Sequence, residues 1–274
     1  MNSNWTNRTQ FSMELKQMLP EYEVIDITPE NEAQYDLFCK KSKKKEEGYQ
    51  SKLGWFQERY NEGMRMKVLF VNERGKMTSR GFIEYIPGEY AWRVVHAPNF
   101  MVIHCLWVVG QWKKKGFGRM LLEACVADAK KRGMDGVAMV TNDGNWLTGK
   151  KILLKNGFEM VDSAPMGFEL VVKRFRDVPN PTFPTNWDER QKRCGKGLTV
   201  FYSSQCPYTP EAVEMSLEAA KEEGVKAKTV HLRTAKELQE KSPSAYGVFG
   251  IVFDGKLVNY QFMKKESLQK ILRS

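Results

Sequence analysis

Apolar positions along the chain follow two spacings: short runs that suit strands, and repeats every three or four residues that suit helices. In the first half the two kinds alternate in mixed order. The predicted elements are a strand over residues 21–28, a helix to about residue 39, a helix over 51–62, an antiparallel hairpin made by KVLFV and RGFIEYI, and a long buried strand over FMVIHCLWVV.

The long strand runs into QWKKKGFGR, a polar turn, after which the apolar spacing predicts a helix over 119–132. A short strand (GVAMVT) follows, then a helix in WLTGKKILLKNGF that Gly157 caps, and a closing strand pair, FEMVDSA and FELVVKRF. One parallel crossover among antiparallel strands predicts a mixed sheet covered by helices, an α/β (α+β) fold.

The pattern changes at FRDVPNPTFPTNW, where three prolines lie within seven residues and predict an extended, semi-rigid linker. A helical DERQKRC leads into a second unit with the order strand, helix, strand, hairpin and helix, and Asp254-Gly255 forms the hairpin turn. We therefore expect one domain over residues 1–176, a linker over 177–196 and a smaller domain over 197–274.

Composition narrows the possible partners. The 274 residues carry a net charge of +10, and most of the excess lies before residue 197. Such a charge suits nucleic acid, an anionic surface or an anionic ligand such as a phosphorylated cofactor, but the lysines lack interleaved aromatics or a nucleic-acid reader motif. Neither a secretory signal nor an apolar run of about 20 residues is found, so we expect a soluble, cytoplasmic protein without membrane contact. Five widely spaced cysteines predict reduced thiols and no metal site.

The polar turn joins a buried strand to a helix, and that position has a specific chemistry. The first N–H groups of a helix have no partner within it, and the helix dipole adds partial positive charge there. Gly116 and Gly118 allow a phosphate to approach closely, and the neighbouring lysines add charge. The turn therefore predicts a pyrophosphate site, although a tight turn with solvated lysines would have the same sequence.

The turn lacks the third glycine of a dinucleotide fingerprint and the Gly-Lys-Ser/Thr of a P-loop. It resembles the signature of the GCN5-related N-acetyltransferase (GNAT) family, a strand followed by Gln/Arg-x-x-Gly-x-Gly/Ala and a helix. Lys113 stands at the Gln/Arg position, and LLKNGFEMVD resembles the end of the family's next helix. The resemblance extends over about residues 20–176 and implies an acetyl-CoA cofactor.

By that resemblance, Trp107 and Val108 contact the pantetheine arm, and Asn142 or Asn145 contacts its far side. Either asparagine is explained equally well as a turn residue in NDGN. The resemblance assigns the pyrophosphate to Lys113, Lys114, Lys115, Gly116, Phe117, Gly118 and Arg119.

The catalytic residues depart from the family pattern. Many members place a tyrosine, which protonates the departing thiolate, where this chain has Leu153. For proton removal from the acceptor, the candidates are Glu84 in FIEYI, Glu89 in the aromatic loop, and His104 beside Cys105. His104 is also explained as a core histidine, Cys105 as a small buried residue, and the aromatic loop as a cover over the sheet.

The second unit offers one candidate nucleophile. Cys206 precedes a predicted helix, whose N-terminus would lower the pKa of the thiol. CPYT resembles the Cys-Pro-Tyr-Cys site of glutaredoxins, and the whole chain resembles bacterial GNAT proteins with a C-terminal thioredoxin-like (YoaP-like) domain. Thr209 replaces the second cysteine, so an internal disulfide of that site is not possible. A structural cysteine on a fold used for docking or substrate binding is the alternative.

The main hypothesis is an acetyl-CoA-dependent N-acetyltransferase that acts on a small amine, with the second domain assisting acceptor recognition. The alternative is a catalytically degenerate protein that binds CoA or senses thiols, which Leu153 would allow. Nucleic-acid binding ranks last, and the sequence leaves the acceptor and the oligomeric state open.

Overall fold

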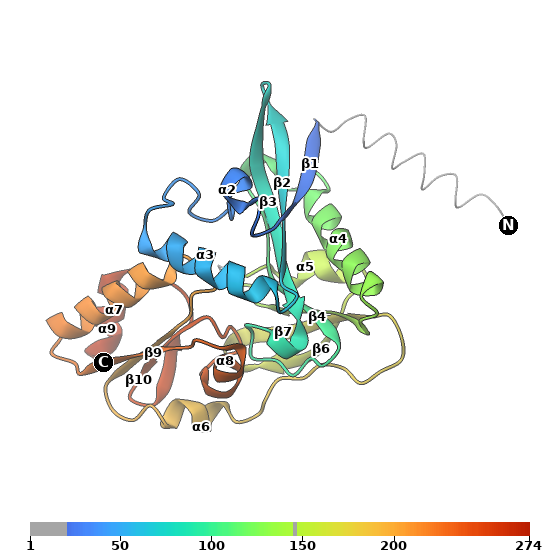
Figure 1. The fold of residues 1–274 in the computed structure, drawn as a ribbon. Coiled ribbons are helices and arrows are strands. Elements are labelled where there is room, and N and C mark those ends of the chain that lie inside the picture. The colour runs from blue at the N-terminus through green and yellow to red at the C-terminus, as the bar shows by residue number, and fades with distance from the viewer. Residues whose placement is uncertain (1–20, 145–146) are drawn as a thin grey trace.

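The computed structural model describes residues 21–144 and 147–274, which form two β-sheets with helices packed on them (Figure 1). The larger sheet has seven strands in the order β1-β2-β3-β4-β5-β7-β6. Neighbouring strands are antiparallel except β4 and β5, which run parallel, so the predicted mixed sheet is confirmed. The strands are β1 (Tyr22–Ile27), β2 (Arg65–Glu73), β3 (Lys76–Pro87), β4 (Phe100–Val108), β5 (Gly136–Thr141), β6 (Glu159–Ala164) and β7 (Phe168–Arg174).

Helices cover both faces of the larger sheet because side chains alternate along its strands. Ile103 of β4 belongs to the cluster beneath α4 (Phe117–Lys131), whereas its neighbour Val102 belongs to the cluster beneath α3 (Glu47–Tyr60). Two shorter helices complete this part, α2 (Glu32–Tyr35) and α5 (Lys150–Leu154).

The segment after α2 departs from the prediction. The expected helix to residue 39 ends at Tyr35, because Asp36, Phe38 and Lys40 all adopt positive φ, which a right-handed helix cannot contain. Lys40 is buried beside Glu46 and Glu211. The irregular chain here lines the cavity described below.

The smaller sheet has four strands in the order β11-β10-β8-β9. β8 (Leu198–Tyr202) and β9 (Ala227–His231) are parallel, while β10 (Phe249–Phe253) is antiparallel to both β8 and β11 (Lys256–Asn259). The predicted hairpin turn is confirmed, with positive φ at Asp254 and Gly255. The helices here are α6 (Trp187–Lys192), α7 (Thr209–Glu222), α8 (Ala235–Lys241) and α9 (Lys265–Leu272).

One of these helices, α8, was not predicted. It begins after Thr234, whose Oγ1 accepts the N–H of Glu237 at 3.1 Å, while Glu237 Oε2 accepts the N–H of Arg233 at 3.0 Å. The Thr and Glu of the stretch TAKE have the spacing of a capping box, so the sequence contained a signal for the start of this helix.

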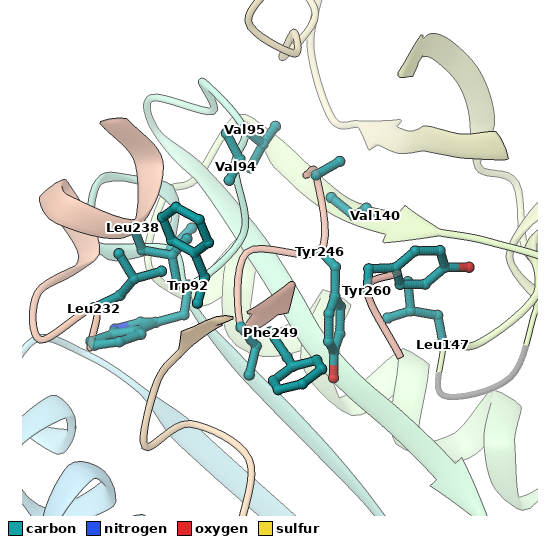
Figure 2. Close-up of a cluster of buried hydrophobic side chains, with 14 of the residues drawn as sticks. Trp92, Val94, Val95, Val140, Leu147, Leu232, Leu238, Tyr246, Phe249 and Tyr260 are labelled. Atoms are coloured by element: carbon teal, nitrogen blue, oxygen red, sulfur yellow. The ribbon is translucent and has the colours of Figure 1, made fainter. Parts of the chain in front are cut away.

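The two sheets share one hydrophobic core. Figure 2 shows Trp92 beside Leu232 and Leu238, and all three belong to a buried cluster that extends over both sheets. Tyr260, which follows β11, packs against Phe168 of β7 with ring centroids 4.5 Å apart. The sheets are therefore packed directly against each other.

The segment 177–196 is part of this packing. Thr182 pairs with His96 through two backbone hydrogen bonds, and Phe183 and Trp187 are buried. The segment predicted as a linker thus follows the surface of the larger sheet before α6. Within the described ranges, none of the helices is long and apolar enough to cross a membrane.

Candidate active site

A cavity of about 560 Å³ lies where the two sheets meet. Strands β3 and β4 form part of its wall, and residues 37–40 and the chain after β5 form other parts. The second sheet contributes residues 205–208, which join β8 to α7, and Tyr246 before β10. Segments remote in the sequence therefore enclose one space.

The cavity reaches a split between β4 and β5. The two strands are paired only from Phe100 with Gly136 to Ile103 with Met139, while β4 continues along β3 to Val108. Beyond Ile103, the edge of β4 that faces β5 lacks that partner strand, and Thr148 donates its hydroxyl to the carbonyl of Leu106 at 2.6 Å. Trp107 and Val108, predicted to contact the pantetheine arm, lie on this split part of β4.

The lysine turn follows directly. Gly116 adopts φ +85° and α4 begins at Phe117, so the first N–H groups of a fifteen-residue helix are at the surface beside Lys113, Lys114 and Lys115. Trp112 donates to Glu73 at 2.6 Å, which fixes the turn to β2. The structure brings the predicted phosphate-binding residues together at the end of the split.

Two residues of that turn need correction. Phe117 is fully buried, and its side chain packs against Tyr22 and Trp112, so that side chain does not contribute to a phosphate site. Arg119 is exposed and pairs with Glu123 at 2.8 Å, one turn along the helix.

Asn142 does not contact the split as expected. Asn142 is buried; its oxygen accepts from Gly144 N and Tyr260 Oη, each at 2.7 Å, and its nitrogen donates to Met166 at 2.9 Å. It fixes the turn and the contact between the sheets, so we no longer assign it to the pantetheine arm. Asn145 lies outside the described residues.

Glu84 lies at the floor of the cavity with three partners. Its Oε2 accepts from Lys52 at 2.5 Å, and its Oε1 accepts from Gln205 at 2.7 Å and faces His104 Nδ1 at 3.1 Å. Burial alone would raise the pKa of Glu84, but the Lys52 ammonium and the His104 N–H lower it to about 2. Glu84 is therefore an anion that is already well satisfied, which makes it a weak base.

The catalytic assignment of His104 is wrong. The backbone N–H of Trp92 donates to His104 Nε2 at 2.9 Å, so the ring carries its proton on Nδ1 and directs it to Glu84. The ring is fully buried, and that burial lowers its pKa to about 4. His104 is a neutral residue that positions Glu84.

The expected low pKa of Cys206 is also wrong. Burial raises the pKa of this thiol to about 12, and the N–H of Tyr208 offsets only part of that effect. The donors at the helix start favour the thiolate, but the loss of water on burial outweighs them. Cys206 nevertheless lines the cavity, as do Cys39 and Cys105, whose pKa values burial also raises.

The remaining candidates lie elsewhere. Glu89 is exposed, does not line the cavity and accepts the N–H of Asn99. Leu153 is fully buried in the cluster beneath α4. Across the described part of the chain, no group of three or more His, Cys, Asp or Glu side chains is arranged to hold a metal ion.

Sequence reasoning missed three residues that line the cavity: Lys52, Gln205 and Tyr246. Lys52 lies on the buried side of α3, 4.0 Å over the ring of Trp55. A lysine within the apolar spacing of that helix was the available signal. Gln205 and Tyr246 are in loops and gave no comparable signal.

We expect acid destabilisation to begin near pH 6.5. Because His104 has a folded-state pKa of about 4 and a reference value of 6.5, the unfolded chain takes up a proton first as the pH falls. This removes about 2 kcal/mol of stability between pH 7 and pH 5. Urea unfolding at both pH values checks it, with His104→Gln, which keeps a donor and an acceptor, as control. An equally large loss in His104→Gln would show that other groups, such as His231, are responsible.

We expect Cys206 to alkylate slowly. With the pKa near 12, its labelling rate at pH 6 should be at least about a hundredfold below that in the unfolded chain. Iodoacetamide labelling of the folded protein and of the urea-unfolded chain at the same pH, each followed by peptide mass mapping, measures the two rates. Rapid, selective labelling of Cys206 in the folded protein would restore the original assignment as a reactive thiol.

Known proteins are similar to this chain over different spans. "Uncharacterized N-acetyltransferase YoaP" of Bacillus subtilis strain 168 is 32% identical over 254 residues, which cover 91% of this chain and 98% of that protein. The model of the acetyltransferase (GNAT) family matches residues 30–146.

Similar solved structures include aminoglycoside 6'-acetyltransferase type Ii, at 17% identity and a TM-score of 0.42 over 57% of this chain and 99% of that one. Another is the PaiA N-acetyltransferase of Thermoplasma acidophilum in complex with coenzyme A, with 17% identity, a TM-score of 0.39 and the same coverage of both chains.

Proposed function

Because the chain belongs to the GNAT acetyltransferase family, we propose that it transfers the acetyl group of acetyl-CoA to a small amine held between its two sheets. The observation that carries this proposal is the single cavity that runs from the split of β4 and β5 to Glu84. A cofactor arm and an acceptor meet in one enclosed space.

The residues at the split fit acetyl-CoA. The unpaired edge of β4 offers the backbone groups of Val108, beside the exposed Trp107 side chain, to the amides of pantetheine. The N–H groups at the start of α4, with Lys113 to Lys115 around them, suit a pyrophosphate. When bound, the cofactor supplies an acetyl group activated as a thioester.

The second sheet supplies the other wall. We assign it to residues 197–274 and to a thioredoxin-like domain, and its strand order and the β8-α7-β9 crossover support this. Gln205, Cys206 and Tyr246 face the acceptor end of the cavity. With the pKa of Cys206 raised and Thr209 in place of a second thiol, the role of this domain is acceptor recognition rather than disulfide exchange.

The proton for the departing thiolate needs a donor other than Leu153. Tyr246 is the candidate, because it is buried in the cavity wall and burial raises its pKa, so it remains protonated at neutral pH. We expect Tyr246→Phe to lower kcat about tenfold or more without changing the KM for acetyl-CoA. Steady-state rates check this, with Tyr90→Phe, a change at an exposed tyrosine outside the cavity lining, as control. An unchanged kcat would assign the proton transfer to water.

Release of free CoA from acetyl-CoA tests the function. The wild-type chain is incubated with a panel of aromatic and aliphatic amines, and the N-acetyl product is identified by mass. Amine-dependent thiol release is the predicted result. Binding of CoA without release for any amine would favour the catalytically degenerate, CoA-binding alternative that Leu153 allows.

A further inference from the structure

We propose that the acceptor is an aromatic amine that enters the cavity without charge. This inference rests on the proposed function and specifies its substrate class. Three features of the cavity support it: the composition of its wall, the absence of a free counter-ion, and the lack of a strong base.

The wall of the cavity is predominantly apolar and rich in aromatic rings. Phe38 and Phe82 lie together with ring centroids 4.7 Å apart, and Leu106, Met139 and Tyr246 line the same space. A flat, apolar acceptor gains by leaving water for such a wall, whereas a long polar amine loses its hydration. The cavity volume of about 560 Å³ must also hold the end of the cofactor, so the acceptor is small.

The charged groups in the wall are already paired. Among the described residues that line the cavity, Glu84 is the only carboxylate, and Lys52 neutralises it at 2.5 Å. Lys40 is held by Glu46 and Glu211. An ammonium ion in this cavity would find each of these carboxylates already paired with a lysine, and a buried charge without a partner is strongly unfavourable.

A further cation lies behind the wall. Arg93 is fully buried and donates to the carbonyls of Trp92 at 2.7 Å and His104 at 2.6 Å. In the described chain no ion pair includes this guanidinium, and it is 4.0 Å from the sulfur of Cys105. Its charge opposes an acceptor that arrives protonated.

Among the described residues that line the cavity, no group is able to remove a proton from an ammonium ion. Glu84 has three hydrogen-bond partners that stabilise its ionised form, and His104 accepts a backbone N–H at its only basic nitrogen. An amine must therefore be neutral before it binds. Aromatic amines are neutral at pH 7 because the ring withdraws the nitrogen lone pair, whereas alkyl amines are protonated.

Two isomeric amines test, in the wild-type enzyme, whether the acceptor must be neutral at pH 7. 4-Methylaniline and benzylamine contain the same atoms, are both apolar, and differ in whether the nitrogen is attached to the ring. We expect kcat/KM at pH 7 to be more than about tenfold higher for 4-methylaniline, since each unit of amine pKa above the working pH removes a factor of ten from the neutral fraction. Spermidine, an aliphatic polycation, should give no release above background.

The pH profile gives an independent readout. Between pH 6.5 and pH 9 the rate with 4-methylaniline should be nearly flat, whereas that with benzylamine should rise with its neutral fraction. Preference for benzylamine or spermidine at pH 7, or release with other panel amines but not 4-methylaniline, overturns the aromatic acceptor and leaves the acetyltransferase function intact. Failure of the chain to bind CoA in calorimetry overturns both.

Discussion

Gly116→Val should weaken CoA binding about a hundredfold while the chain stays folded. Gly116 adopts φ +85°, which a β-branched residue avoids, so valine must shift the backbone that presents the first N–H groups of α4. Loss of two charge-assisted hydrogen bonds to phosphate accounts for a change of this size. Isothermal titration calorimetry with CoA measures it.

Gly133→Val is the matched control. Gly133 lies past the other end of the same helix, has φ +71°, and like Gly116 has open space around the position of an added Cβ. Both substitutions impose similar backbone strain, so similar unfolding free energies with different CoA affinities are predicted. Equal CoA affinity in the two variants would place the pyrophosphate elsewhere.

Glu84→Gln should lower the free energy of unfolding by about 3 kcal/mol or more, since it leaves the Lys52 ammonium buried without a counter-ion. Urea denaturation at pH 7 measures the loss. The double variant Lys52→Met/Glu84→Gln should be more stable than Glu84→Gln alone, because the unpaired charge is gone.

Glu123→Gln is the control for that measurement. It removes a carboxylate from an exposed pair with Arg119 and should change stability by less than about 1 kcal/mol. If Glu84→Gln were no more destabilising than Glu123→Gln, the buried pair would not stabilise the fold, and the charge argument for a neutral acceptor would lose its basis.

The elements that were predicted correctly from the sequence are those encoded by residues close together in the chain. The strand, glycine turn and helix from residue 100 to 131 are encoded by neighbouring residues, and so is the Asp254-Gly255 hairpin. The turn that carries the predicted phosphate site lies within one such local unit. The turn could therefore be predicted without knowing which distant residues it contacts.

The acceptor side could not be read in this way. The Glu84 carboxylate of β3 is contacted by Lys52 from α3, His104 from β4 and Gln205 from the loop after β8. Only tertiary packing brings these three side chains to it. The error over Cys206 has the same origin: the helix start that favours a thiolate is visible in sequence, but the burial that outweighs it comes from the other sheet.

A crystal structure of the chain grown with CoA would locate the cofactor. We expect the pyrophosphate at the N–H groups that follow Gly116, the pantetheine along the edge of β4 at Trp107 and Val108, and the sulfur inside the cavity between the two sheets. CoA bound with its sulfur outside that cavity, or with its pyrophosphate away from the start of α4, would contradict this expectation.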